Sequence, residues 1–342
     1  MMKKVSVKDV ALAAGVSVAT VSRAYNLPDK VRDDVRDKVI RIAERMGYSP
    51  NPAAQALRRQ RSHTIGVVIP SLNYAIFARL VESFQEVLVA AGYNVLVLTT
   101  GYDNHKMYSP VKKLIDRGID GLMVVGQIFD QELRDYIISR KLPCVTSYSY
   151  TDDPQIPSIG FDNFEATKKI VEHLIKMGHT HISMFAGPSQ GNDRQQERIR
   201  AFKETLIQSG LMDNAIIVER EYMDAARQGA EALRTIRSER PGTTAIVCNS
   251  DVFAFSIISE CIKLGIRVPD EMSVAGFDDD SYTSLFNPPL TTIAVPATEL
   301  GKHTAREMLS ALTHRKHIMP SRFETHLIVR ESTSIPHSRN AS

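Results

Sequence analysis

The sequence predicts an α/β protein in which a small all-helical head precedes a larger core of parallel β-sheets. In the first fifty residues, apolar side chains recur at helical spacing. From Thr64 onward, short continuous apolar runs alternate with amphipathic segments of helix length, which is typical of parallel strands covered on both faces. About 270 residues follow this pattern, more than one compact sheet usually contains, so we expect two doubly wound lobes.

Local signals divide the head into three helices. Ser6-Val7-Lys8-Asp9 has the form of a capping box, so a helix begins directly after Ser6, and Gly15 ends it because glycine enters the left-handed conformation freely. Ser17 is an N-cap for a second helix over about residues 18–25, and a third is predicted over about 32–46.

Two short helices joined by Gly-Val-Ser and followed by a third form a helix-turn-helix layout. The outward positions of the second helix are small apart from one arginine: Val18, Ala19, Ser22 and Arg23. A helix that enters the major groove of DNA needs this profile. The alternative is a helical bundle of another purpose.

The charge is divided unevenly along the chain. Residues 1–61 contain 13 Lys and Arg against 6 Asp and Glu, a net +7, whereas the remainder carries 29 basic and 33 acidic residues, a net −4. A basic head suits a polyanion such as nucleic acid, although a solvated helical surface has the same composition.

The segment 51–61 is predicted to be a hinge and linker. Asn51 can cap a helix and Pro52 suits its first turn, but only about seven residues follow before the basic stretch. An isolated helix of that length is marginal in water, so we expect it to be helical only when supported. A plain interdomain linker is the alternative.

The core strands are predicted from apolar runs at residues 65–69, 95–98, 121–125, 143–145, 181–185, 245–248 and 272–276. The polar end, residues 337–342, is expected to be loose. Three widely separated cysteines without a CxxC pair argue against a zinc site or a disulfide framework and fit a reducing compartment. Because a signal peptide and an apolar membrane span are also missing, we expect a cytoplasmic protein.

Two other classes of protein are alternatives to a DNA-binding regulator. A secreted solute-binding protein has a similar core, but the basic head and the missing signal peptide argue against it. An enzyme is disfavoured because GxSxG, P-loop, HExxH and post-strand GxGxxG motifs are absent, and we expect no cofactor. The acidic run 278–280 could bind a metal, but such runs are usually solvated or cap a helix.

Many short motifs resemble the lactose/galactose repressor (LacI/GalR) family, in the family's order and over essentially the whole chain. In the head these are Val7-Lys8-Asp9-Val10-Ala11, Ala14-Gly15-Val16-Ser17, Ala19-Thr20-Val21-Ser22-Arg23, Ala24-Tyr25-Asn26, Gly47-Tyr48-Ser49-Pro50-Asn51 and Ala54-Gln55-Ala56-Leu57. In the core they are Ile65-Gly66-Val67, Asp120-Gly121-Leu122, Gly178-His179, Ala186-Gly187-Pro188, Arg198, Val268-Pro269-Asp270-Glu271, Gly276-Phe277-Asp278 and Pro288-Pro289-Leu290-Thr291-Thr292-Ile293.

The resemblance implies a dimeric repressor of a palindromic operator, with a helix-turn-helix domain over 1–50 and a bilobed, periplasmic-binding-protein-like effector core over 62–336. The implied first lobe spans about 62–161 and 292–322, and the second about 162–290 and 323–336, so the chain crosses near Asp162, Thr291 and Phe323. Arg23 matches a base-reading arginine, and Leu57 matches a leucine that the hinge inserts into the minor groove. The implied DNA-binding residues are Ser6, Ser17, Val18, Ala19, Thr20, Ser22, Arg23, Asn26, Asn51, Ala54 and Leu57.

The same resemblance implies a small-molecule effector between the lobes, with a sugar or sugar acid favoured and a nucleoside or purine as the alternative. The implied effector-binding residues are Ile76, Phe77, Gln127, Tyr148, Arg198, Tyr222, Asp251 and Asp278. Tyr148 and Ser250 depart from residues that many sugar-binding members carry, and a second arginine, Arg194, favours an acidic ligand. The polar C-terminal end lacks the leucine heptads of tetrameric relatives, so we expect a homodimer.

Overall fold

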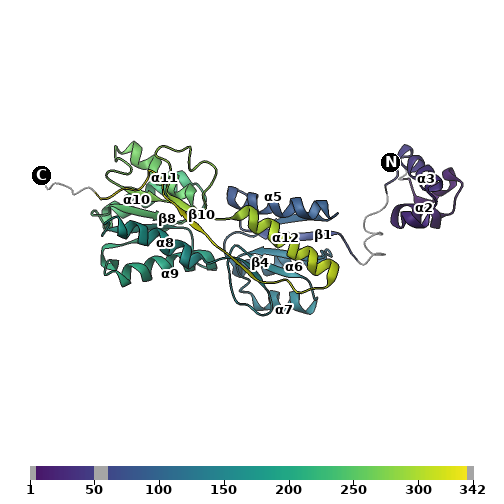
Figure 1. Ribbon diagram of the computed structural model, residues 1–342, viewed down its shortest axis with the longest axis horizontal. Helices are drawn as coiled ribbons and strands as arrows, with labels where there is room; N and C mark the ends of the chain where they lie inside the picture. Colours follow the sequence, from purple (N-terminus) through teal and green to yellow (C-terminus); the bar gives the residue numbers. More distant parts are fainter. Residues whose placement is uncertain (1–4, 50–60, 337–342) are drawn as a thin grey trace. The chain divides into compact units, whose positions relative to one another are not determined.

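The computed structural model describes residues 5–49 and 61–336 and divides the chain into two compact units, residues 1–63 and 64–342 (Figure 1). The first is the helical head and the second is the α/β core. The predicted fold class is therefore confirmed. The hinge residues Asn51, Ala54 and Leu57 and the end 337–342 lie outside the described residues.

The head is a three-helix unit comprising α1 (Val7–Ala14), α2 (Val18–Asn26) and α3 (Asp33–Arg45), with a 3-10 turn over Pro28–Lys30. The capping box is confirmed, because the Ser6 side chain accepts from the backbone N–H of Asp9 and the Asp9 carboxylate accepts from that of Ser6. Gly15 ends α1 with φ 67°, and the Ser17 hydroxyl caps α2. The helices enclose a small core of Val10, Val21 and Val39, all fully buried.

The first lobe of the core is a six-stranded parallel sheet in the order β11-β5-β4-β3-β1-β2. Its strands are β1 (Thr64–Ile69), β2 (Asn94–Thr99), β3 (Gly121–Val125), β4 (Cys144–Ser147), β5 (Ser158–Phe161) and β11 (Ser321–Phe323). Helices α5 (Ala75–Ala90) and α12 (Ala297–His314) pack together on one face, and α6 (Tyr108–Asp116) and α7 (Gln131–Ser139) cover the other (Figure 1).

The second lobe is a four-stranded parallel sheet in the order β7-β6-β8-β9. Its strands are β6 (Ile182–Ala186), β7 (Ile217–Glu219), β8 (Ala245–Cys248) and β9 (Ser273–Ala275). Helices α8 (Asn163–Lys176) and α9 (Asp193–Gln208) cover one face, and α10 (Ala225–Glu239) and α11 (Asp251–Lys263) cover the other (Figure 1). Each sheet thus carries a buried apolar layer on both sides, as continuous apolar strands require.

Three segments connect the lobes. The chain leaves the first lobe after β5, returns through β10 (Thr292–Ala294) before α12, and leaves again between β11 and β12 (His326–Ile328). Strands β10 and β12 form an antiparallel pair between the two sheets. These connections fix the two sheets with the carboxyl ends of their strands toward a shared crevice.

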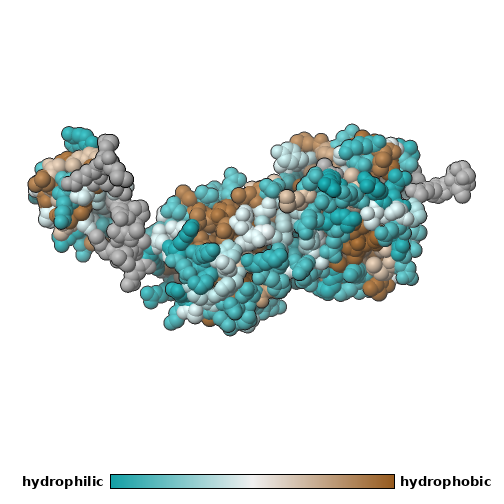
Figure 2. Space-filling model, turned by 180° about the vertical axis from the view of Figure 1, so that it is seen from behind, coloured by the Kyte–Doolittle hydropathy of each residue, from teal (hydrophilic) through white to brown (hydrophobic). Residues whose placement is uncertain are grey.

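Two details differ from the sequence prediction. The run at 95–98 was predicted to be a strand covered on both faces, but β2 is an edge strand in which Leu96 is 38% exposed. The strands that were not predicted are β5, β7, β10, β11 and β12, which have only three or four residues each and are too short for hydrophobic periodicity to reveal. The surface is mainly hydrophilic, with separate hydrophobic patches on both lobes (Figure 2). Within residues 5–49 and 61–336, no helix has the length and apolar character needed to cross a membrane.

Candidate effector site and DNA-binding face

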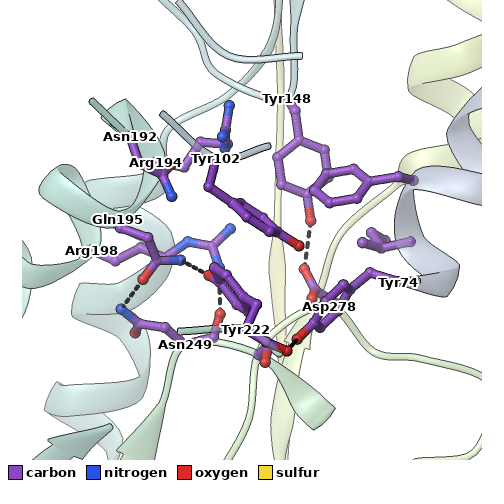
Figure 3. Close-up of a pocket in the computed structure, with 13 residues that line it drawn as sticks. Tyr74, Tyr102, Tyr148, Asn192, Arg194, Gln195, Arg198, Tyr222, Asn249 and Asp278 are labelled. Carbon is purple, nitrogen blue, oxygen red and sulfur yellow. Dashed lines mark hydrogen bonds between the residues drawn. The ribbon is translucent and has the colours of Figure 1, made fainter. Parts of the chain in front are cut away.

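A pocket lies between the two lobes, where loops that follow the carboxyl ends of parallel strands meet (Figure 3). This crevice is the usual ligand site of open α/β sheets. The first lobe contributes residues that follow β1, β2 and β4, and the second contributes the start of α9 and residues that follow β7, β8 and β9. The lining residues are Tyr74, Ile76, Phe77, Tyr102, Tyr148, Asn192, Arg194, Gln195, Arg198, Tyr222, Asn249, Ser250 and Asp278.

Arg198 is the cation at the base of this pocket, and it is held rigidly. It projects from the second turn of α9 and is 3% exposed. Its Nε donates to Asn163 Oδ1 at 2.9 Å and its Nη1 to the Asn249 carbonyl at 2.8 Å. The guanidinium also lies 3.5 Å from the centre of the Phe277 ring. Such a fixed fork is suited to binding hydroxyl or carboxylate oxygens.

Asp278 is the acidic partner in the pocket and links the lobes. Its carboxylate accepts a 2.5 Å hydrogen bond from the Tyr148 hydroxyl, which belongs to the first lobe (Figure 3). Burial raises the pKa of Asp278 to about 6, while the nearby Arg198 and the Tyr148 hydrogen bond act in the opposite direction. Near neutral pH, Asp278 is therefore mostly ionised and serves as an acceptor.

Tyrosine rings occupy most of the pocket. Tyr102 of the first lobe stacks on Tyr222 of the second, with ring centres 4.1 Å apart and planes inclined by 26°. Tyr222 in turn stacks on Phe253 at 5.0 Å, and its hydroxyl accepts from Gln195 Nε2 at 2.7 Å. Tyr74 crosses from the first lobe and donates its hydroxyl to the Tyr222 carbonyl at 3.1 Å. The second-lobe wall is thus a fixed aromatic platform.

The remaining space is small and its polar lining is incompletely paired. The cavity measures about 20 Å³, enough for about one water molecule. Among the described residues, four buried polar atoms of the lining have no hydrogen-bond partner: Tyr102 Oη, Asn192 Oδ1, Arg194 Nη2 and Asn249 Oδ1. Buried polar groups are normally paired, so the hydrogen-bonding capacity of this lining is not used up within the protein.

The structure brings six of the eight residues expected in the effector site to this pocket: Ile76, Phe77, Tyr148, Arg198, Tyr222 and Asp278. Gln127 and Asp251 do not line it. The Gln127 carbonyl accepts from Asn104 Nδ2 at 2.7 Å. Asp251 begins α11 and accepts from the Thr292 hydroxyl and the backbone N–H of Asp280, and burial raises its pKa to about 8.

Several lining residues were missed by the sequence analysis: Tyr74, Tyr102, Asn192, Gln195 and Asn249. Tyr102 and Asn249 shared one usable signal, because both follow predicted strands whose carboxyl ends face the crevice. Tyr148 and Ser250, which depart from residues common in sugar-binding relatives, both belong to the site. Tyr148 donates to Asp278, and Ser250 lines the pocket and caps α11. Arg194 donates to the Val125 carbonyl across the cleft at 3.0 Å.

The acidic run 278–280 is engaged with protein groups. Asp279 forms an ion pair with Arg330 at 2.8 Å, and Asp280 lies 3.9 Å from Arg79. Within the described part of the chain, no group of three or more His, Cys, Asp or Glu side chains is arranged to hold a metal ion.

The head presents the outward face of α2 to solvent. Val21 and Ala24 are buried, whereas Ser6, Ser17, Val18, Ala19 and Arg23 are exposed and Thr20, Ser22 and Asn26 are partly exposed. Ser17 and Thr20 are joined by a 2.9 Å hydroxyl contact at the start of the helix. An exposed N-terminal half with small side chains and one arginine can enter a major groove without a clash.

Comparison with known protein families gives two matches that fit this architecture. Residues 6–51 match the model described as bacterial regulatory proteins, lacI family. Residues 171–333 match the model of a periplasmic binding protein-like domain. The first match covers the helical head, and the second lies in the α/β core.

Curated relatives match over nearly the whole chain. The HTH-type transcriptional repressor CytR of Escherichia coli K12 is 31% identical over 333 residues, covering 96% of each chain. Catabolite control protein A of Priestia megaterium is 28% identical and covers 87% of this chain and 89% of its own. The solved lac repressor dimer bound to operator and an anti-inducer superposes with a TM-score of 0.82 at 26% identity, over 97% of this chain and 100% of its own.

These relatives are transcriptional regulators rather than enzymes, and the likeness extends through both units. Head and core therefore form one regulator, in which a DNA-binding unit is joined to an effector-binding-type domain. The chain belongs to the lacI family of bacterial transcriptional regulators.

Proposed function

We propose that this regulator represses transcription by binding a palindromic operator as a homodimer, under the control of a small molecule bound between the core lobes. The pocket carries the proposal: it joins a rigid Arg198 and an ionised Asp278 to buried polar atoms that have no partner among the described residues. A solved relative, the lac repressor dimer bound to operator, supports the assembly.

On the DNA side, Arg23 reads a guanine, Val18 and Ala19 contact thymine methyls, and Leu57 enters a central CG step. The exposed positions of α2 support the first two roles, and the family resemblance supports the third. The further proposed contacts are Ser6, Ser17, Thr20, Ser22, Asn26, Asn51 and Ala54.

Arg23→Ala tests the DNA-binding face, with Arg41→Ala as the matched control because Arg41 is exposed on α3 of the same head. We expect the first variant to lose about 1–3 kcal/mol of operator affinity and its preference at one guanine per half-site. Binding should also weaken steeply as salt is raised. Salt-insensitive binding to a genomic fragment library, or equal losses in the two variants, would contradict the proposal.

Large exposed apolar side chains on the second lobe support dimerisation. Met223 is 80% exposed, Leu285 79% and Tyr282 63%. Two-fold symmetry of the protein is what a palindromic operator requires. Light scattering should give about twice the 38.1 kDa mass of one chain, and a stable mass near four chains would be the opposing result.

The effector is proposed to be a sugar or a sugar acid, because Arg198 and Asp278 supply a donor and an acceptor beside an aromatic platform. Hydroxyl groups need both kinds of partner in a desolvated cleft. A nucleoside or purine is the second candidate, and the stacking of Tyr102 on Tyr222 favours it because it shows that a flat ring fits on the aromatic platform.

A thermal-shift screen of sugars, sugar acids, nucleosides and purines, followed by operator titration, tests the site. Asp278→Asn and Arg198→Ala should abolish the response to a hit while ligand-free operator binding persists. Arg200→Ala is the control, since Arg200 lies on the outer face of the same helix and pairs with Glu197 and Glu204. A wild-type response in both pocket variants would show that the site is wrongly placed.

A further inference from the structure

The ring of Tyr102 occupies the centre of the proposed effector pocket. It projects from the loop after β2 and reaches between Tyr148 and Tyr222 (Figure 3). Its stacking partner, Tyr222, belongs to the other lobe, and Tyr222 is backed by Phe253. The first lobe therefore places one of its own flat rings on the aromatic platform of the second.

This placement is unfavourable for the Tyr102 hydroxyl. The oxygen is buried and has no hydrogen-bond partner among the described residues. Burial also raises the pKa of Tyr102, as expected for a phenol removed from water. If the side chain rotated outward, the hydroxyl would be hydrated, so the lost ring stacking would be offset in part by recovered hydrogen bonds.

The loop permits such a rotation. Tyr102 is only partly buried as a residue, so part of it already contacts solvent. On either side the backbone is fixed, because the N–H of Gly101 donates to the Pro70 carbonyl at 3.0 Å and that of Asn104 to the Gly191 carbonyl at 2.8 Å. Neither bond involves Tyr102, so the side chain can leave while its neighbours stay in place.

A ligand ring in the same place would satisfy atoms that Tyr102 leaves unpaired. Asn192 Oδ1 and Asn249 Oδ1 lack donors, and Arg194 Nη2 lacks an acceptor, among the described residues. A ring bearing polar substituents on its edge offers both. The Tyr102 hydroxyl bonds to none of these three atoms, which lie at the start of α9 and directly after β8.

We propose that Tyr102 is a tethered competitor of the effector: its ring holds the stacking place on Tyr222, and an effector ring binds there only after Tyr102 has left. This inference rests on the proposed effector site. Tyr102 therefore lowers the apparent affinity for the effector. Only molecules in which the ring is displaced can bind the effector, and their fraction scales the apparent affinity.

The first test uses p-cresol, the free equivalent of the tyrosine side chain, on the full chain without DNA. Tyr102→Ala opens a space shaped like this ring, so p-cresol should raise its melting temperature by at least about 2 °C, as small rings stabilise engineered cavities. Wild type and Tyr102→Phe, in which a ring still covers Tyr222, should not respond. Equal responses in all three proteins, or none in Tyr102→Ala, would overturn the proposal.

The second test uses the hit from the sugar and nucleoside screen. If the ring is displaced in about one wild-type molecule in ten, Tyr102→Ala should bind the hit about tenfold more tightly than wild type does. Tyr102→Phe keeps the ring and removes the unpartnered hydroxyl, so it should bind several-fold more weakly than wild type and melt at a higher temperature. Weaker binding by Tyr102→Ala would show instead that Tyr102 is a direct ligand contact. The p-cresol result remains decisive when no compound from the screen binds.

Discussion

The hydrogen bond from Tyr148 to Asp278 should stabilise the core by an amount that depends on pH. Both groups are buried, and they join the end of β4 in the first lobe to the loop after β9 in the second. Tyr148→Phe removes the hydroxyl and preserves the ring that packs on Phe77 and Phe161. The substitution therefore isolates the bond from the surrounding packing.

The expected magnitude follows from the charge of Asp278. Its pKa is about 6, so at pH 8 the carboxylate is ionised. Tyr148→Phe then removes a charge-assisted hydrogen bond, which should lower the free energy of unfolding by about 1.5–3 kcal/mol. At pH 5 the carboxyl is mostly protonated, and the loss falls to about 0.5–1.5 kcal/mol. Removing the donor also raises the pKa of Asp278 further, so the destabilisation grows as pH rises through 6.

Urea unfolding followed by circular dichroism at pH 5 and pH 8 measures both values. Tyr136→Phe is a matched control, because Tyr136 also donates to an aspartate, Asp116, but at the surface of the same lobe. Hydrogen bonds from Lys112 and from Tyr136 hold the pKa of Asp116 below its usual value, so that carboxylate is ionised at both pH values. The control should show a small, pH-independent effect.

A second background separates charge from packing. In Asp278→Asn the partner of Tyr148 is a neutral amide at every pH, so the cost of Tyr148→Phe should become the same at pH 5 and pH 8. If the pH dependence persists in that background, or if the cost is equal at both pH values in wild type, the ionised Asp278 is not what the Tyr148 hydroxyl stabilises.

Three further outcomes are expected. Burial raises the pKa of Asp251 to about 8, so this group should make stability fall as pH rises from about 4 to 8, by at most about 1.4 kcal/mol per unit, and Asp251→Asn should remove that part of the slope in urea titrations. Gly126→Ala should destabilise the core by at least about 1–3 kcal/mol more than Gly118→Ala, because both have positive φ but only at Gly126 would a Cβ meet Arg194, at 1.7 Å. Ser17→Ala should lower the stability of the head by about 1 kcal/mol, measured by thermal circular dichroism, because it removes the hydroxyl that caps α2; an unchanged head would show that the cap contributes nothing.

Sequence reasoning succeeded where the cause is local. The capping box of Ser6 and Asp9, the left-handed Gly15 and the N-cap Ser17 are set by residues within four positions of one another, and the structure shows each of them. Buried strands were also predictable, because parallel strands covered on both faces read as continuous apolar runs. The buried strand β5 was missed because it is only four residues long, and the run of β2 does not reveal that this strand lies at the edge of the sheet.

The pocket could be predicted only in part, because its geometry depends on contacts between distant segments. Tyr102 and Tyr222 are 120 positions apart and belong to different lobes, so their contact depends on how the lobes pack. Asp251 illustrates a register problem: it was expected in the cleft because it follows β8, but the residues before it, Asn249 and Ser250, line the pocket. Asp251 points instead toward Thr292 and the 278–280 loop. A shift of two residues at a strand end exchanges a lining side chain for a supporting one.

The loop that carries Asp278 connects the pocket to helix α5. Asp278 and Asp279 both have positive φ, so this loop is held in an uncommon conformation by its partners. One partner is Arg79 of α5, which donates to the Asp279 carbonyl at 3.3 Å, and another is Arg330, which binds the Asp279 carboxylate. A ligand shifts the lobe equilibrium only by its difference in affinity for the two arrangements. Asp278 lines the pocket, while its neighbour Asp279 accepts from Arg79 of α5 in the other lobe. A ligand that binds Asp278 in the proposed site would therefore act on a loop that is itself bonded to both lobes.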